Sequence, residues 1–157
     1  MKFRGTLKQT TYKAFRIKKL NSLATLPTKG SEQSAGWDLY AAIPDEEIVI
    51  QPGCIAKIGT GLSIELPEGT FGGVFARSGL ATKQGLRPAN CVGVCDSDYR
   101  GEYIVALYND SDKARIVHNG DRIAQLVILP YVKCDYEEVE ELSDTERGNG
   151  GFGSTGK

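Results

Sequence analysis

The stretch RIVHNGDRIAQLVIL, residues 115–129, decides the fold class. Two apolar runs lie on either side of Asn119-Gly120, and this residue pair is typical of the tight turn that joins the two strands of a β-hairpin. Both runs are rich in isoleucine, valine and leucine, residues that suit a strand with one buried face. The stretch therefore predicts a β-hairpin.

Similar short apolar runs occur along most of the chain. Leu62, Ile64 and Leu66 alternate with Ser63 and Glu65, and the runs FRIKKL, EEIVI and EYIVALY look alike. Turn signals separate the runs: QPG at 51–53, PEG at 67–69 and DYRG at 98–101. Many short strands between such turns indicate an all-β sandwich, jelly roll or barrel. One segment differs, because RSGLATKQGL at 77–86 predicts a turn or two of helix.

Length and charge exclude several classes of protein. The 157 residues suit one domain, and the net charge is -1. A dedicated DNA or RNA binder usually has a strong basic excess, so we expect no nucleic-acid partner. No apolar stretch approaches the ~20 residues of a membrane span, and no apolar run follows the basic N-terminal residues as it would in a secretory signal. We therefore expect a cytoplasmic protein without a membrane partner.

Four cysteines and one histidine limit the possible metal and disulfide sites. Cys91 and Cys95 are four residues apart, which is not the spacing of a zinc knuckle. Without a secretory context we expect these thiols, with Cys54 and Cys134, to be reduced and to pack as small core residues. Because His118 is the only histidine, a multi-histidine metal site is excluded, and a Ser-His-Asp triad would depend on this one residue.

The last eleven residues, RGNGGFGSTGK, are rich in glycine. Residues 151–157 fit most of the phosphate-loop formula, but no helix follows Lys157 and the chain lacks the alternating βα pattern of that fold. Glycines still let a backbone wrap closely around anionic oxygens. Arg147 adds a fork for phosphate, and Phe152 adds a flat face for a base. Taken alone, the tail is compatible with a disordered terminus and with a nucleotide-binding arm.

Five segments together resemble the sequence motifs of the trimeric dUTP pyrophosphatases (dUTPases). In chain order they are SAGWDLYA (34–41), ARSGLA (76–81), NCVGVCDSDYRG (90–101), NGDRIAQL (119–126) and RGNGGFGSTG (147–156). The resemblance runs from about Phe15 to the C-terminus. It implies a jelly-roll-like β-barrel with one short helix, assembled as a homotrimer with shared active sites. It also divides the chain into an extension (1–14), a β domain (15–146) and a flexible arm (147–157) that closes over the nucleotide.

The resemblance implies hydrolysis of dUTP to dUMP and pyrophosphate, by attack of water on the α-phosphorus. Asp96 matches the aspartate that activates this water, a role typically worth ~10²–10⁴ in rate. Asp98 is the alternative by spacing, because alternate residues of a strand share a face, and we assign it a supporting role. The implied cofactor is Mg²⁺ held by the triphosphate and by waters, which suits a chain without a cluster of protein ligands.

The resemblance also implies the substrate contacts. Tyr99 matches the tyrosine that leaves no room for a ribose 2′-hydroxyl. The residues that match the hairpin for uracil are Asn90, Gly93, Val94, Cys95 and Ile104. Those that match phosphate contacts are Arg77, Ser78, Gly79 and Gln125, and those of the arm are Arg147, Phe152, Gly153, Ser154 and Thr155. Asp38 and Asp121 match acidic positions that hold arginines or metal-bound waters.

Two other functions stay open on the sequence. A dCTP deaminase shares the fold family, but the DSDYRG segment and the glycine-rich arm disfavour it, and ammonia release from dCTP would revive it. A nucleotide-dependent regulatory protein without catalysis is the other, although Asp96, Tyr99 and the arm argue against a loss of activity.

Overall fold

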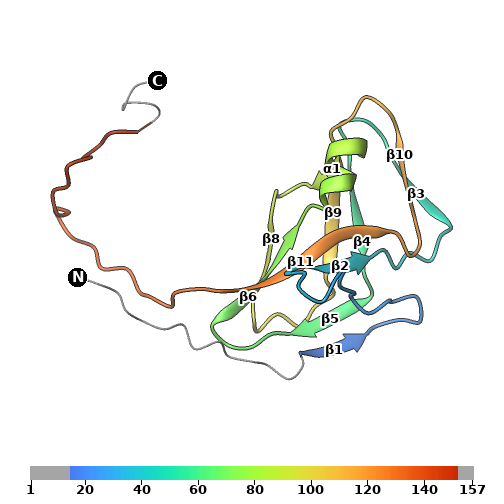
Figure 1. Cartoon of the computed structure of the whole chain (residues 1–157), viewed down its shortest axis with the longest axis horizontal. Helices are drawn as coiled ribbons and strands as arrows, with labels where there is room; N and C mark the ends of the chain where they lie inside the picture. The colour runs from blue at the N-terminus through green and yellow to red at the C-terminus, as the bar shows by residue number, and fades with distance from the viewer. Residues whose placement is uncertain (1–14, 152–157) are drawn as a thin grey trace.

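The structure, a computed structural model, describes residues 15–151, and residues 1–14 and 152–157 lie outside the described residues. The described part is all-β with one short helix, as the sequence predicts (Figure 1). In chain order the elements are β1 (Arg16–Lys19), β2 (Trp37–Tyr40), β3 (Glu47–Ile50), β4 (Ile55–Gly59), β5 (Leu62–Glu65), β6 (Thr70–Phe75), α1 (Ser78–Gln84), β7 (Leu86–Pro88), β8 (Gly93–Cys95), β9 (Ile104–Asn109), β10 (Arg115–His118) and β11 (Arg122–Pro130).

The described strands form four antiparallel sheets rather than one closed barrel. The largest has the order β2-β11-β6-β8, and a three-stranded sheet has the order β4-β9-β7. The pairs β1-β5 and β3-β10 complete the set. Side chains from all four sheets meet in one hydrophobic cluster, in which Leu39, Ile58, Leu107 and Ala124 have no exposed surface. The core is therefore shared, and β8 lies at one edge of the largest sheet.

The predicted hairpin around Asn119-Gly120 is wrong in its pairing, although the turn is present. Gly120 has φ 83°, and Asp121 N–H donates to the His118 carbonyl at 3.1 Å. The flanking strands do not pair with each other: β10 pairs with β3, and β11 pairs with β2 and β6. The turn is instead fixed from outside, since Gly120 N–H donates to the Ala41 carbonyl and Ala41 N–H donates to the Asp121 carbonyl, each at 2.8 Å. It is a corner between two sheets.

Because it contains two glycines, the segment that forms β6 does not show the residue pattern of a strand. β6 reads TFGGVF, which has no alternation and carries two residues that disfavour strands. The structure explains Gly72, because a Cβ there would come within 2.9 Å of Leu126 Cδ1 and 3.2 Å of Leu66 Cδ1. β6 therefore packs closely under its neighbours while its backbone bonds to β11 and β8.

The four cysteines are free thiols, as expected, but their predicted place in the core is wrong for three of them. Cys54, Cys91 and Cys134 are exposed, and Cys95 is half-buried. Cys54 follows the 51–53 turn, and Cys91 lies in a turn with φ 63°, a left-handed conformation that is uncommon outside glycine. Turns lie at the surface whatever the polarity of their residues.

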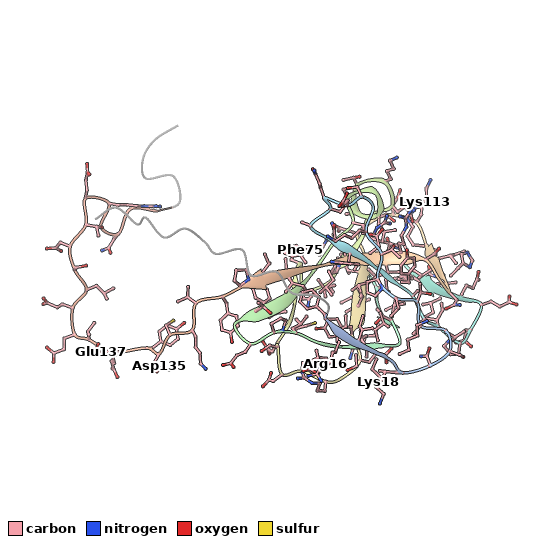
Figure 2. All side chains as sticks on the ribbon, turned by 60° about the horizontal axis from the view of Figure 1, so that its bottom comes forward. Arg16, Lys18, Phe75, Lys113, Asp135 and Glu137 are labelled. Atoms are coloured by element: carbon pink, nitrogen blue, oxygen red, sulfur yellow. The ribbon has the colours of Figure 1, made fainter. Side chains whose placement is uncertain are left out.

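Residues 131–151 contain no helix or strand and run away from the body of the molecule (Figure 1). Figure 2 shows Asp135 and Glu137 on this segment, apart from the body that carries Arg16 and Phe75. The acidic stretch 135–144 is exposed throughout and is a connector, in agreement with the polar sequence. Within residues 15–151, no helix has the length and apolar character needed to cross a bilayer.

Candidate active site

A cavity of about 220 Å³ between β8 and β9 brings together five of the predicted site residues. These are Val94, Cys95, Asp96, Tyr99 and Ile104. Glu102 and Tyr103 also line the cavity, and the sequence reasoning did not select them. Both lie directly after the DSDYRG segment and just before β9. Their place between these two parts of the site was the signal that could have selected them.

One wall of this cavity is β8, which carries Val94 and Cys95. Cys95 lies opposite Gly72 and Val94 lies opposite Gly73 in the ladder with β6. Of the strands that the structure describes, none pairs with the other edge of β8. An edge strand presents backbone N–H and C=O groups to any ligand of matching shape. Gly93 is the first residue of β8. A Cβ on Gly93 would come within 3.2 Å of Val74 Cβ and 3.4 Å of Asn90 Nδ2.

Asp96 and Asp98 lie in the turn after β8, and the structure separates their positions. Tyr99 N–H donates to the Asp96 carbonyl at 3.2 Å, which closes the turn. Asp96 is exposed and lines both the cavity with Tyr99 and a second cavity of about 660 Å³. Asp98 lines only the second of these two cavities, together with Glu65, Glu68 and Arg100. Asp96 is thus the carboxylate that faces both spaces.

Tyr99 lies over its own loop. Its hydroxyl donates to the Glu102 carbonyl at 3.1 Å, and its ring centroid is 6.2 Å from that of Tyr103. A Cβ at Gly101 would overlap the Tyr99 hydroxyl, so the loop needs glycine at this position. Tyr99 is 44% exposed and lines the cavity, where a ligand could contact it.

The half-buried Cys95 and the buried Tyr103 both line the cavity. Burial raises the pKa of the Cys95 thiol; the Tyr103 hydroxyl lowers it in part, and the Asp96 carboxylate raises it. Burial likewise raises the pKa of the Tyr103 hydroxyl, and the Cys95 thiol adds to this shift. A thiol is a weak hydrogen-bonding group, and the buried Tyr103 Oη has no partner of normal hydrogen-bond geometry among residues 15–151. Both groups are therefore neutral at pH 7.

A second cluster centres on Asp38 of β2. Its side chain is 15% exposed and accepts from Arg77 Nε at 2.8 Å and from Arg122 Nη1 at 3.1 Å. Arg77 is the residue before α1, and the predicted contacts Ser78 and Gly79 are the exposed first residues of that helix. Sequence reasoning missed Arg122, although it stands next to Asp121, which was selected. Asp38 thus pairs with two arginines from distant parts of the chain.

Gln125 and Asp121 complete this second cluster in different ways. Gln125 Nε2 donates to the Ala76 carbonyl at 2.8 Å, and Gln125 and Asp38 line one cavity of about 680 Å³. Asp121 lines a smaller cavity of about 220 Å³ with Arg77 and Arg122. Its carboxylate accepts the His118 N–H at 2.8 Å, so the contact seen for Asp121 stabilises the 119–120 turn.

The two clusters lie toward opposite ends of β6. Cys95 is opposite Gly72, and Arg77 follows Gly72 by five residues. At about 3.3 Å per residue, some 16 Å of extended chain separates the two ends. None of the four cavities described above contains both Asp96 and Arg77.

The predicted arm is described only in part. Arg147 is exposed on the segment that runs away from the body, where its Nε donates to the Gly150 carbonyl at 2.8 Å. It does not join either cluster. Phe152, Gly153, Ser154 and Thr155 lie outside the described residues.

Comparison with known proteins gives one answer by sequence and by structure. A family model described as dUTPase matches residues 22–156. The deoxyuridine 5'-triphosphate nucleotidohydrolase of Desulfitobacterium hafniense is 53% identical over 132 residues, which cover 83% of this chain and 87% of that protein. A mutant dUTPase of Staphylococcus bacteriophage 80alpha, solved with dUpNHpp, has a TM-score of 0.84 at 29% identity and covers 93% of this chain and 100% of its own.

A further solved relative carries a metal. It is a mutant dUTPase from phage phi11 of S. aureus, described with a structural Mg(II) ion, with a TM-score of 0.72 at 27% identity over 82% of this chain and 97% of its own. The family model spans most of the sequence, the relatives cover most of their own length, and the folds agree. The chain therefore belongs to the dUTPase family of hydrolases.

Proposed function

We propose that this chain hydrolyses dUTP to dUMP and pyrophosphate, by attack of an Asp96-held water on the α-phosphorus. The observation that carries the proposal is the cavity beside β8, which combines an open strand edge, the Tyr99 ring and the Asp96 carboxylate. Its volume of about 220 Å³ is below the ~300–1,000 Å³ of a pocket that encloses a whole drug-sized ligand. It suits the nucleoside end of a nucleotide, with the triphosphate outside.

Uracil would be read by the edge of β8 and by the side chains around it. Backbone N–H and C=O groups of Gly93 to Cys95 can pair with the polar edge of the base, and Asn90 lies against Gly93. A 5-methyl group would overpack a narrow pocket, at a typical cost of ~1–3 kcal/mol. Cytosine would bring a donor where uracil brings an acceptor, and the unmet groups would cost ~1–3 kcal/mol. Ile104 supports the apolar side of the pocket.

Tyr99 would select the sugar. Its ring is fixed over Gly101 by the hydroxyl contact with Glu102, so it cannot retreat easily from a bound nucleoside. A ring held against C2′ of the sugar excludes a ribose hydroxyl by contact. Asp96 belongs to the same turn, so it would lie beside the sugar, where the α-phosphate of a bound nucleotide begins.

Asp96 would hold the attacking water and accept its proton. The carboxylate is exposed at the junction of two cavities, so water reaches it freely before the nucleotide binds. General-base help of this kind typically contributes ~10²–10⁴ in rate. Asp98 lines the neighbouring cavity and would support the turn rather than act on the water.

The phosphate contacts would come from a second copy of the chain. Arg77, with Ser78 and Gly79 beyond it, lies about 16 Å along the strand from Cys95 and farther still from Asp96, too far for both to meet one triphosphate. Gln125 lies nearer, opposite Phe75, but its side chain bonds to Ala76 beside Arg77. In a homotrimer with shared active sites, the arginine cluster of one copy would face the nucleoside cavity of another. We also propose that the four sheets form the jelly-roll-like core of each copy.

The arm from Arg147 to Lys157 would close over the bound nucleotide, with Phe152 stacked on uracil and Arg147, Gly153, Ser154 and Thr155 at the phosphates. The exposed connector at 131–151 lets the arm leave the body of its own copy. Ordering each residue costs ~1–2 kcal/mol of backbone entropy, so closure should require the nucleotide. A closed arm excludes water other than the nucleophile.

The donor set fits a magnesium ion brought in by the substrate. Residues 15–151 contain no cluster of three or more potential metal ligands, while Asp96 and Asp98 present carboxylates near the expected triphosphate. Mg²⁺ commonly binds through substrate phosphates and waters. When bound it would neutralise phosphate charge and fix the triphosphate for in-line attack.

Pyrophosphate release from dUTP, UTP, dTTP and dCTP, each with magnesium and in ¹⁸O-labelled water, tests the proposal. We expect turnover of dUTP far above the other three, with the label in dUMP. Label in pyrophosphate would place the attack on the β-phosphorus instead. No pyrophosphate from dUTP would refute the proposal, and ammonia from dCTP would favour the deaminase.

A further inference from the structure

The position of the Tyr99 ring depends on the backbone of Glu102. Tyr99 Oη donates to the Glu102 carbonyl at 3.1 Å across the intervening Gly101. This hydrogen bond, with the Tyr103 ring 6.2 Å away, sets how far the ring leans over its loop, since Tyr99 is otherwise 44% exposed. Any movement of Glu102 would therefore move the ring.

Glu102 is in turn fastened to the corner between β4 and β5. Its Oε1 accepts the Gly61 N–H at 2.7 Å, and a Cβ at Gly59 would come within 2.5 Å of the same oxygen. Gly61 has φ 64°, a conformation that favours glycine, and a Cβ there would come within 2.8 Å of Ala24 Cβ. The carboxylate thus fills the space that Gly59 leaves for it and accepts the Gly61 N–H.

Two further bonds join the same corner to the loop. Thr60 is completely buried, and its Oγ1 donates to the Tyr103 carbonyl at 2.7 Å. Ser63 Oγ donates to the Arg100 carbonyl at 2.8 Å. The loop of residues 99–103 is therefore anchored on both sides of Glu102 by residues 60–63, far from it in the sequence.

We propose that Glu102 is a positioning residue for sugar selection, acting through Tyr99. Its carboxylate oxygen, held by the Gly61 N–H, fixes the Glu102 carbonyl and so keeps the Tyr99 ring against the 2′ position of the nucleotide. What the role requires is the acceptor oxygen and not the negative charge. The inference rests on the proposed function, because sugar selection has meaning only for a nucleotide in this cavity.

Steady-state kinetics of Glu102→Ala and Glu102→Gln with dUTP and UTP test this role. Alanine removes the acceptor, so the ratio of kcat/KM for dUTP over UTP should fall at least roughly threefold. Glutamine keeps the oxygen, and the ratio should stay within about twofold of wild type. A merely structural defect would lower turnover of both nucleotides together and leave the ratio unchanged.

Two more variants complete the comparison. Glu47→Ala removes an exposed glutamate of β3 outside the site, and its ratio should match that of the wild type. Ser63→Ala removes the hydrogen bond to the Arg100 carbonyl and should also lower the ratio. This variant keeps the test available if Glu102→Ala fails to fold. An unchanged ratio in the soluble anchor variants, or equal losses in Glu102→Ala and Glu102→Gln, would overturn the inference.

Amide hydrogen exchange separates this inference from the proposed function, because it needs no turnover. In Glu102→Ala, exchange in segments 59–63 and 98–103 should be at least roughly tenfold faster than in wild type, while Glu102→Gln stays close to wild type. A wild-type chain that leaves dUTP intact would refute the proposed function alone. Unchanged exchange in Glu102→Ala and Ser63→Ala would refute the anchoring by itself.

Discussion

The unpaired hydroxyl of Tyr103 makes Tyr103→Phe a stabilising substitution. Tyr103 is 2% exposed, and its Oη has no hydrogen-bond partner of normal geometry among the described residues. A buried hydroxyl without a partner costs about 1–3 kcal/mol. Removing it leaves a void of roughly 10 Å³, which at ~24 cal/mol per Å³ costs only ~0.2 kcal/mol. The net gain is then about 1–2 kcal/mol after allowance for the weak contact with Cys95.

Thermal unfolding measures this gain directly. For a chain of this size, about 1 kcal/mol shifts Tm by ~2–4 °C, so Tyr103→Phe should raise Tm by ~2–8 °C. Tyr40→Phe is the matched control, because Tyr40 Oη is paired with Thr28 Oγ1 at 2.5 Å. That variant should lose ~0.5–1.5 kcal/mol and melt lower. A lower Tm for Tyr103→Phe would mean that its hydroxyl is satisfied, and would refute the reasoning.

Three other predictions concern the arginine cluster, the thiol and the arm. Asp38→Ala leaves Arg77 and Arg122 unpaired and should lower Tm by about 2–8 °C, with a smaller loss in Asp38→Asn; equal Tm for wild type and Asp38→Ala would contradict the account. The pKa of Cys95 is raised in the folded chain from its ordinary 9.0, so its contribution to stability is complete below pH 9 and is lost as pH rises through the folded pKa. Cys95→Val should therefore flatten the alkaline fall of Tm, and an equally steep fall in the two proteins would count against this. Deleting residues from Arg147 onward should leave the proposed homotrimer intact, as light scattering would measure, but lower kcat/KM for dUTP; unaltered kinetics, or a monomeric product, would exclude the lid.

Local sequence rules predicted the elements whose residue pattern depends only on neighbouring residues. The alternation at Leu62, Ile64 and Leu66 matches β5, and the apolar run after Asp121 matches β11, the longest strand. The predicted helix is present as well and ends at Gly85, whose φ of 68° lets the chain turn away. These signals depend on neighbouring residues, and so they can be read without the fold.

Pairing could not be read in the same way. The Asn119-Gly120 turn is present, yet its flanking strands pair with partners far away in the chain. The backbone of Ala41 forms hydrogen bonds with Gly120 and Asp121 of the turn instead. The sequence pattern did not predict β6, because Gly72 is required there by the side chains packed against it and lowers the strand propensity of the segment. Register between distant segments depends on the whole core.

The candidate site shows the same division. Motif resemblance selected Asp96 and Tyr99, and the structure places both at one cavity. It did not reveal that Arg77 lies beyond the far end of β6, nor that Arg122 shares Asp38 with it. Those facts depend on which strands are neighbours, which a linear order of motifs leaves undetermined.

Single-turnover pyrophosphate release from dUTP, compared for wild type, Asp96→Asn and Asp98→Asn with magnesium, tests the central claim most directly. The account predicts a loss of at least ~10²-fold in Asp96→Asn with nucleotide binding retained, and a loss of no more than about tenfold in Asp98→Asn. Wild-type turnover by Asp96→Asn, or a larger loss in Asp98→Asn, would contradict it.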